Sequence, residues 1–585
     1  MVGLLIVGII SLLVIVASEQ LGEKTGVVAP LMLLVLGVAA GLIPQVPNFV
    51  LSPELILEGI LPPLLYASAV AMPVMDFRRN LGPISTLSVL LVIATSLALG
   101  VLFKTFVPGL GWAGGIALGA IISPTDAVAT SIVKSKGVSH RLITVLEGEG
   151  LINDASALVI LRSAIAATAA GTISLSAVAV DFFWAVSGAL LIGWLVGEVA
   201  IRVRAKIVSS NADTVMSLTV PFLAALPAEH FGASGLVAAV MAGLVTGHHS
   251  AALVPPDHRL TTRQTWSVIS LILEGAVFLM MGIQVGALLE DLRADTLGLA
   301  QAVAMAAIAI VITLVMRTLL VFPIMRLTRQ PKASRRTVKV QKKLSRVDQI
   351  LSEMADEEEI EQKRALAPLR MRGLRRRVDR AMADLRYYQE ARLGYRDGVV
   401  MIWSGMRGAV TLAAAQTLPL NTPHRAFLLV TAFLVASMSL ILQGGTLGWV
   451  IKWVKPSENQ PCTRAERQAL VRILCDAAEA VPAPAGLAEA LGPQDAALLN
   501  NARGGAVALA TRLFDALNQN QRPRISKEIA EQAIEYAVAI THAQRLALLK
   551  VRSAGNLDSQ LLTDTMNSLD ANQISLELRI HPETH

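Results

Sequence analysis

Long apolar stretches, each interrupted by only a few polar residues, recur along most of the 585-residue chain. A helix that crosses a bilayer needs about 20 largely apolar residues. The pattern predicts thirteen such helices, at residues 3–17, 26–44, 52–72, 83–106, 113–134, 142–169, 178–200, 212–229, 233–249, 266–288, 297–325, 398–419 and 425–452. The chain is therefore predicted to be an all-α polytopic membrane protein.

The polar stretches divide the chain into four parts. Residues 1–325 hold the first eleven predicted helices, and residues 398–455 hold the last two. Residues 326–397 form a polar insertion. Residues 456–585 are Ala-rich with an amphipathic pattern, which predicts a small helical domain. We expect the insertion and this last domain to lie in the cytoplasm.

The insertion is strongly basic, with twenty Lys and Arg against eleven Asp and Glu, a balance of +9 against +7 for the whole chain. Its apolar spacing predicts charged amphipathic helices. Contact with anionic lipid and simple solvation in the cytoplasm both fit this pattern. Binding of nucleic acid is not expected, because the basic run offers few aromatic residues, such as Tyr387 and Tyr388, on which bases could stack.

Basic residues in the short loops predict the orientation of the chain, because cytoplasmic loops are enriched in Lys and Arg. Alternate loops share one side of the membrane, and the richer side carries Arg78, Arg79, Lys134, Lys136, Arg141, Arg202, Arg204, Lys206, Arg259 and Arg263. With thirteen helices, this bias places the N-terminus outside and the C-terminus in the cytoplasm.

The composition excludes an ordinary soluble protein, since 54% of the residues are hydrophobic, 16% are charged and the mean hydropathy is +0.57. Cys462 and Cys475 suggest neither a disulfide framework nor a zinc site. The soluble tail shows no catalytic constellation. We predict that the protein is not an enzyme and needs no cofactor.

Polar residues inside predicted helices are the first candidates for function, because charge within a membrane is costly. Thr125 and Asp126 lie in the fifth helix, Asp154 in the sixth and Arg407 in the twelfth. At a rise of about 1.5 Å per residue, all four lie near the middle of their helices. A structural role would suit any one of them alone, whereas the shared depth favours a common site.

The fifth and twelfth predicted helices contain residues that interrupt helices. Pro124 removes a backbone donor, and Gly405 and Gly408 flank Arg407. Interrupted helices at corresponding positions of two six-helix halves are typical of transporters built from inverted repeats. We predict two such crossed, broken helices, with the Asp126 carboxylate compensating their positive ends. A simple kink at Pro124 is the alternative.

Five short segments resemble, in their order, the motifs of monovalent cation:proton antiporters. They are Leu61–Tyr66, Ser123–Ala127, Glu147–Leu158, Leu273–Leu279 and Trp403–Val410. The chain is most similar to the bacterial sodium/proton exchanger branch, whose sixth helix carries an Asn-Asp pair. The resemblance covers roughly residues 1–455. It implies a homodimer in which a core domain moves, as in an elevator, against a dimerisation domain.

The resemblance also implies roles for individual residues. Asp154 matches the carboxylate that binds either a monovalent cation or a proton, Asn153 matches its neighbour, and Thr125 matches a residue that donates an oxygen ligand to the cation. Glu149 and Arg407 match an ion pair that braces the core.

Other positions match the family less simply. Glu274 and Arg317 match polar positions, and they could pair with each other or with groups of the core. Gly150 replaces the Ser that many relatives carry four residues before the key Asp, and Ala67 replaces an acid of the third helix. Both departures bear on the cation ligands and on ion selectivity.

These patterns predict a secondary antiporter of the plasma membrane that exchanges Na+, Li+ or K+ for H+ by competition of cation and proton for Asp154. The single Asn-Asp pair favours electroneutral one-for-one exchange, and Asp126 keeps a two-carboxylate electrogenic mechanism open. The alternatives are a sensor or scaffold that keeps the antiporter fold without transport, and a symporter or uniporter of another small ion.

Overall fold

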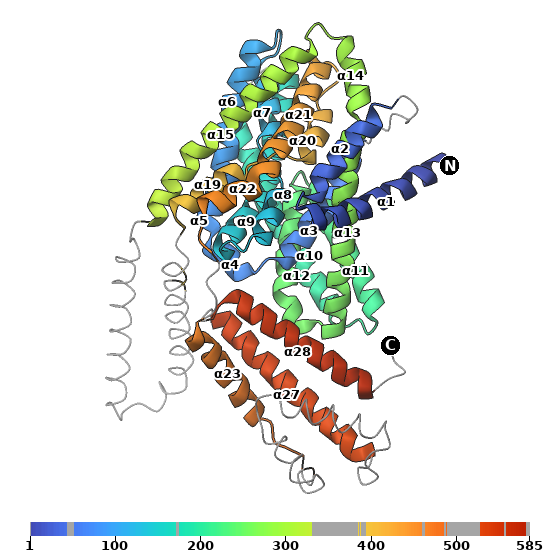
Figure 1. Cartoon of the computed structure of the whole chain (residues 1–585), viewed down its shortest axis with the longest axis vertical. Helices are drawn as coiled ribbons and strands as arrows, with labels where there is room; N and C mark the ends of the chain where they lie inside the picture. The colour runs from blue at the N-terminus through green and yellow to red at the C-terminus, as the bar shows by residue number, and fades with distance from the viewer. Residues whose placement is uncertain are drawn as a thin grey trace. The chain divides into compact units, whose positions relative to one another are not determined.

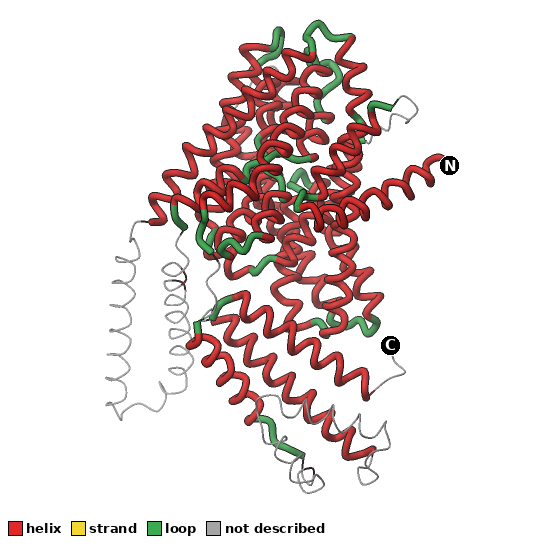
Figure 2. Tube along the Cα trace, viewed as in Figure 1, coloured by secondary structure: helices red, strands yellow, loops and turns green. Residues whose placement is uncertain are grey.

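The computed structural model describes residues 2–43, 52–170, 175–329, 393–458, 463–484, 527–554 and 557–580, with single positions at 384, 387 and 487. Within these residues every regular element is a helix, and the one pair of bridged residues is Val138 with Glu458. Figures 1 and 2 show this all-helical architecture. The predicted helices of the insertion fall almost wholly outside the described residues.

The helices of the first half follow the predicted apolar stretches. They are α1 (Val2–Thr25), α2 (Ala29–Gly41), α3 (Leu61–Ala71), α4 (Val74–Arg79), α5 (Leu81–Ser85), α6 (Leu91–Phe106), α7 (Trp112–Ile122), α8 (Val128–Ser135), α9 (His140–Ala170), α10 (Leu175–Arg204) and α11 (Ser210–His230). Short π-helical turns precede α3 at Leu55–Ile60 and α6 at Thr86–Leu90.

The second half continues in the same way. Its helices are α12 (Gly235–Leu253), α13 (Pro256–Ile283), α14 (Val285–Arg293), α15 (Leu299–Arg329), α19 (Tyr395–Trp403), α20 (Ala409–Gln416), α21 (Arg425–Ser439), α22 (Gly445–Val454), α23 (Arg464–Glu479), α27 (Lys527–Ala554) and α28 (Ser559–Ile580). A π-helical turn at Leu440–Gly444 joins α21 to α22.

The structure supports a membrane protein that crosses the bilayer several times. Within the described residues, eight helical stretches are long and apolar enough to span a membrane, and three shorter apolar helices accompany them. The outer face of α10 is apolar and exposed, with Phe183, Trp184 and Leu191 more than half exposed, as expected of a surface that meets lipid. The all-α polytopic fold is confirmed, while the count of thirteen and the inverted repeats stay predictions.

Small residues let the helices approach closely. A Cβ atom built at Gly119 of α7 would lie 2.3 Å from the carbonyl oxygen of Ser96 on α6, and one built at Gly41 of α2 would lie 2.3 Å from that of Ile283. Both distances are far below a van der Waals contact, so only glycine fits at these crossings. Such small-residue contacts are common where helices pack within membranes.

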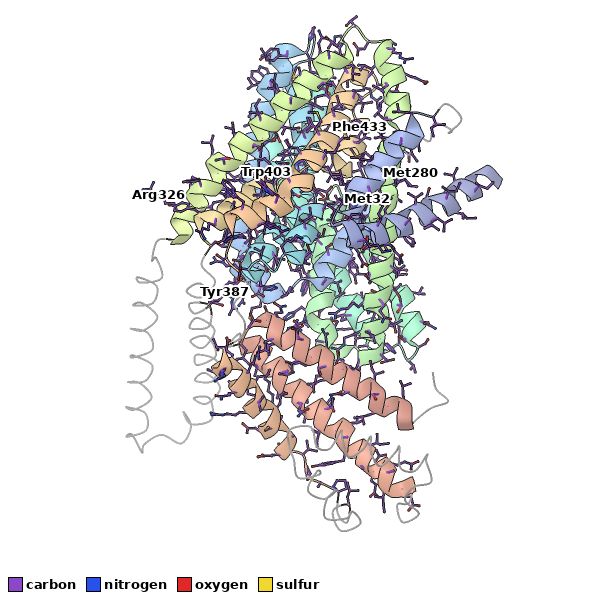
Figure 3. The ribbon with its side chains drawn as sticks, viewed as in Figure 1. Met32, Met280, Arg326, Tyr387, Trp403 and Phe433 are labelled. Carbon is purple, nitrogen blue, oxygen red and sulfur yellow. The ribbon has the colours of Figure 1, made fainter. Side chains whose placement is uncertain are left out.

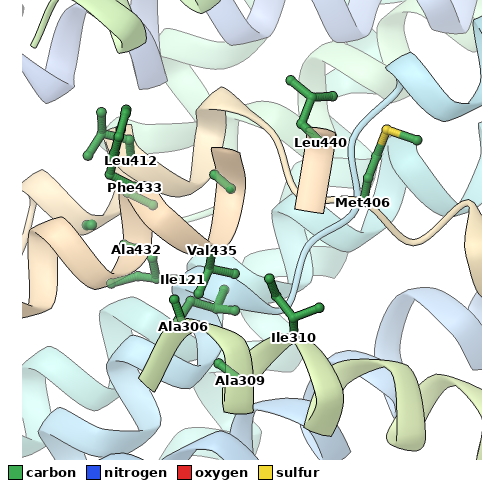
Figure 4. Close-up of a cluster of buried hydrophobic side chains, with 14 of the residues drawn as sticks. Ile121, Ala306, Ala309, Ile310, Met406, Leu412, Ala432, Phe433, Val435 and Leu440 are labelled. Atoms are coloured by element: carbon green, nitrogen blue, oxygen red, sulfur yellow. The ribbon is translucent and has the colours of Figure 1, made fainter. Parts of the chain in front are cut away.

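Buried apolar side chains gather into separate clusters. One cluster includes residues of α6, α7, α9, α15 and α21. Figure 4 shows part of it, where Ala306 of α15 lies beside Val435 of α21, and Phe433 of α21 lies beside Leu412 of α20. A second cluster comprises residues of α10, α11 and α12 with Tyr66 of α3 and Trp266 of α13. We call the first cluster, which includes α15 and α21, the α6–α9 bundle. We call the second cluster the α10–α12 bundle.

A third apolar cluster joins the two bundles. It combines Leu151 and Ala155 of α9 with Leu236, Val240 and Leu244 of α12, and it also includes residues of α3 and α20. Its side chains are aliphatic, so the two bundles meet there without fixed hydrogen bonds between the side chains.

The chain divides into two units, and α23, α27 and α28 belong to the second. In this unit the three helices bury Leu470, Leu548, Leu562, Met566 and Leu569 against one another. The capping box at Thr463 and Glu466 fixes the start of α23, because each of the two residues satisfies a backbone N–H of the other.

Candidate functional site

Two broken helices face each other in the first unit. α7 ends at Ile122 and α8 begins at Val128, while α19 ends at Trp403 and α20 begins at Ala409. The two irregular segments are joined by their backbones, since the Asp126 N–H donates to the Met406 carbonyl at 2.8 Å. Beside the break, Trp403, which is labelled in Figure 3, donates to the Thr446 hydroxyl of α22 at 2.9 Å.

Asp126 lies between the two breaks. Its carboxylate accepts the backbone N–H of Val128 at 3.0 Å, in the first turn of α8, where the helix presents its partial positive charge. A Cβ atom added to Gly408 would lie 1.3 Å from the Asp126 Oδ2 atom. Glycine at position 408 is therefore required for Asp126 to take this place.

Arg407, in the break between α19 and α20, binds the C-terminal end of α7. Its guanidinium donates to the carbonyl of Ile122 at 2.9 Å and to that of Ser123 at 3.5 Å, and also to the Gly405 carbonyl. The last carbonyls of α7 have no partner within the helix and carry partial negative charge. Arg407 is 3% exposed, so this backbone contact is what compensates its charge.

Glu149 forms its ion pair with Arg317 of α15. The two side chains meet through two parallel bonds, Nη1 to Oε1 at 2.5 Å and Nη2 to Oε2 at 2.8 Å, and Arg317 Nε donates to the Met401 carbonyl of α19 at 2.7 Å. The predicted pair of Glu149 with Arg407 is therefore wrong, because Arg407 is engaged by the carbonyls of α7. The open question about Arg317 is also answered: it pairs with a core group.

A chain of hydrogen bonds continues from Glu149 to the Asn-Asp pair. The Thr125 hydroxyl donates to Glu149 Oε1 at 3.2 Å and accepts a hydrogen bond from Asn153 Nδ2 at 2.7 Å. Asn153 Nδ2 also approaches the Thr125 carbonyl oxygen at 3.4 Å. The ion pair thus orients Thr125, and Thr125 in turn orients Asn153.

The Asp154 carboxylate follows Asn153 on α9 and is 7% exposed. It forms no hydrogen bond or ion pair with any residue that the structure describes. The buried Oδ1 atom of Asn153 likewise has no partner among them. One helical turn earlier, a Cβ atom built at Gly150 meets no described atom within 4 Å. Asp154 is therefore available to a ligand, with open space beside it.

Glu274 is not hydrogen-bonded to this network. It is on α13, partly exposed, and makes no hydrogen bond or ion pair with the described residues. The breaks of α7–α8 and α19–α20 join six of the predicted site residues, and Asp154 lies next to them. The six are Thr125, Asp126, Glu149, Asn153, Arg317 and Arg407.

Sequence reasoning missed Ser439, whose hydroxyl accepts the Arg407 backbone N–H at 2.9 Å. A single Ser in an apolar helix carries no distinctive signal.

Broken helices that cross beside a buried carboxylate are typical of secondary transporters, whose ion sites lie at such interruptions. A family model described as "Sodium/hydrogen exchanger, transmembrane" matches residues 8–453. The chain belongs to this family of multi-pass membrane transporters, which confirms the resemblance seen in its motifs. Its place in the family makes it a sodium/proton exchanger in general terms.

Individual relatives agree with this assignment. An uncharacterised Na(+)/H(+) exchanger of Mycobacterium tuberculosis is 27% identical over 475 residues, which is 80% of this chain and 78% of the relative. The Na(+)/H(+) antiporter NhaP of Pseudomonas aeruginosa is 26% identical over 71% of this chain and 84% of its own. A sodium, potassium, lithium and rubidium/H(+) antiporter of Bacillus subtilis is 33% identical over 46% of this chain and 41% of its own.

A solved structure has the same fold. The sodium proton antiporter MjNhaP1 from Methanocaldococcus jannaschii aligns with a TM-score of 0.54 and 16% identity, over 77% of this chain and 99% of its own. At this identity the likeness concerns the fold alone.

Proposed function

We propose that the protein exchanges Na+, Li+ or K+ for H+ by binding the cation and the proton alternately at Asp154. The observation that carries this proposal is the difference between the two acids of α9. Glu149 is held by two bonds from Arg317, whereas Asp154 has no partner among the described residues. A carboxylate held in this way braces the site, while a free one binds whichever cation is present.

The ligands near Asp154 suit a hard monovalent cation, which prefers oxygen. The Thr125 hydroxyl and carbonyl lie beside Asn153, and the Asn153 Oδ1 atom lacks a partner among the described residues. These oxygens would complete a shell with the Asp154 carboxylate. Open space at Gly150 leaves room for water in that shell.

One exchanging carboxylate favours electroneutral exchange of one cation for one proton. Asp126, the second acid near the crossing, accepts a hydrogen bond from the first turn of α8 and fits against Gly408. These contacts support the role of compensating a helix end, rather than of carrying a second proton.

The proposed cycle is elevator-like. The α6–α9 bundle, which carries Asp154, moves against the α10–α12 bundle along the aliphatic surface between them. We further propose a homodimer in the plasma membrane, with the N-terminus outside. The insertion of residues 326–397 and the domain of residues 456–585 would lie in the cytoplasm, where the insertion could meet anionic lipid.

Transport by the purified protein tests the proposal. Proteoliposomes with a pH-sensitive dye inside receive Na+, Li+ or K+ at several pH values, and each cation that is exchanged moves protons. Asp154→Asn should abolish this movement while the protein stays folded. Asp181→Asn, at an exposed position of α10, is the matched control and should transport normally.

The same assay separates the alternatives. Proton movement that persists in Asp154→Asn would refute the proposed site. A folded wild-type protein with no cation-dependent proton movement would favour a sensor or scaffold, and cation uptake that moves no protons would favour a symporter or uniporter. Exchange that responds to an imposed membrane potential would contradict electroneutrality.

A further inference from the structure

One ion pair connects the two bundles beyond the exchange site. Arg162 of α9 donates to Glu229 of α11 at 2.7 Å, and the two side chains are 55% and 27% exposed. Arg162 lies two turns after Asp154, between Leu161 and Ala164, which are both buried in the α6–α9 bundle. Glu229 lies in the last turn of α11, near Ala224 and Ala228, which are buried in the α10–α12 bundle.

Glu229 is held by a second contact besides the one with Arg162. Its Oε1 atom accepts the backbone N–H of Gly235, the first residue of α12, at 2.9 Å, and its Oε2 atom binds Arg162. The carboxylate is therefore fixed to the α11–α12 corner, and the guanidinium reaches it from the other bundle. A displacement of α9 relative to α11 that is longer than the two side chains can follow separates this pair.

Both ends of the α9 face that carries Asp154 are largely covered. Toward the N-terminus of α9, Leu151 is 3% exposed and Gly150 is partly exposed. Toward the C-terminus, Ala157 and Leu161 are each 2% exposed, and Leu158 is partly exposed. The pair of Arg162 with Glu229 lies at the C-terminal end of this face.

From this geometry we propose that Arg162 and Glu229 form a latch that holds the α6–α9 bundle to the α10–α12 bundle at the C-terminal end of α9. The latch breaks when the α6–α9 bundle moves against the α10–α12 bundle. Both side chains are partly exposed, and an exposed pair is weak. The latch therefore biases the two states by only a few-fold, so that the cycle can break and remake it.

Chemical labelling tests the latch without requiring transport. Both native cysteines, Cys462 and Cys475, are replaced with Ser, and Leu158→Cys reports on separation of the two bundles, because Leu158 packs against the cluster that joins them and lies one turn from both Asp154 and Arg162. A membrane-impermeant maleimide is added to whole cells and to inside-out vesicles. From the side at which α9 ends, Glu229→Gln should speed labelling about two- to five-fold.

Two controls identify the pair as the cause. The exchange of charges, Arg162→Glu with Glu229→Arg, should restore slow labelling. Glu198→Gln breaks a pair of like geometry, Glu198 with Arg202 at 2.7 Å. The partners of Glu198, which include His249 of α12 at 3.9 Å, all lie within the α10–α12 bundle, so this change should leave labelling unchanged. Labelling that is equal in parent and Glu229→Gln, absent in every variant, or raised equally by Glu198→Gln would overturn the latch.

The latch rests on the proposed exchange at Asp154, and the two can fail separately. Normal transport by Asp154→Asn refutes the exchange site whatever the labelling. Loss of transport in Asp154→Asn, together with unchanged labelling of the Glu229→Gln protein, refutes the latch alone.

Discussion

Replacing Arg317 with Met removes the guanidinium that holds Glu149, and we expect a large loss of stability. The two side chains are 1% and 2% exposed, so little water could take the place of the lost partner. Breaking a buried pair from one side costs about 3–5 kcal/mol, because the remaining charge is left uncompensated. Arg317→Met also frees the Met401 carbonyl, which places the expected loss toward the upper part of that range.

Thermal unfolding of the purified protein in detergent, followed by tryptophan fluorescence, measures this loss. Arg162→Met is the matched control, since its pair with Glu229 is exposed and should cost about 0–1 kcal/mol. Adding Glu149→Gln to Arg317→Met should recover most of the stability, because no buried charge then lacks a partner. Equal unfolding of Arg317→Met and Arg162→Met, or a double variant weaker than Arg317→Met, would refute this reasoning.

Three further predictions follow from local geometry. Gly408→Ala should abolish folding or transport, because its Cβ atom would strike the Asp126 carboxylate, whereas Gly150→Ala has open space and should fold normally; the yield of monodisperse protein checks both. Gly150→Ser should change the relative apparent affinities for Na+ and K+ several-fold in the proteoliposome assay, because it adds a hydroxyl one turn before the exchange carboxylate, and unchanged affinities would show that this position does not contact the cation. Burial opposes ionisation of Asp295, in the loop before α15, but hydrogen bonds from His424 and from the backbone outweigh it and hold its pKa below the usual range. The stability that this carboxylate contributes is thus present above its ordinary pKa of about 4 and is lost as the pH falls further, so Asp295→Asn should lower the melting temperature at pH 7 and have a shrinking effect below pH about 4; an effect that grows at low pH would contradict it.

Much of the fold could be predicted from the sequence, because a membrane helix needs a long apolar stretch whatever its neighbours are. The helix interruptions at Pro124 and between Gly405 and Gly408 could also be predicted, because these residues change the conformation of their own backbone. The structure breaks both helices at these positions, into α7 with α8 and α19 with α20.

The ion pairs could not be predicted in this way. Arg317 and Arg407 lie in different predicted helices, and the sequence allows either to meet Glu149. Which one does so depends on where α7 ends, because its last carbonyls take Arg407 and leave Glu149 to Arg317, 168 positions along the chain. The pairing depends on the distances between side chains in the folded protein. The spacing of residues in the sequence does not determine these distances. The pair between Arg162 and Glu229 was missed for the same reason.

The availability of Asp154 follows from how the other charges at the crossing are compensated. The charge of Glu149 is compensated by Arg317, that of Arg407 by the carbonyl end of α7, and that of Asp126 by the amide end of α8. Each of these contacts is buried, so neither Arg317 nor Arg407 can turn toward Asp154 without breaking a buried interaction. These contacts therefore do more than stabilise the fold. They keep Arg317, Arg407 and the amide end of α8 away from Asp154, the carboxylate that we propose exchanges its partner.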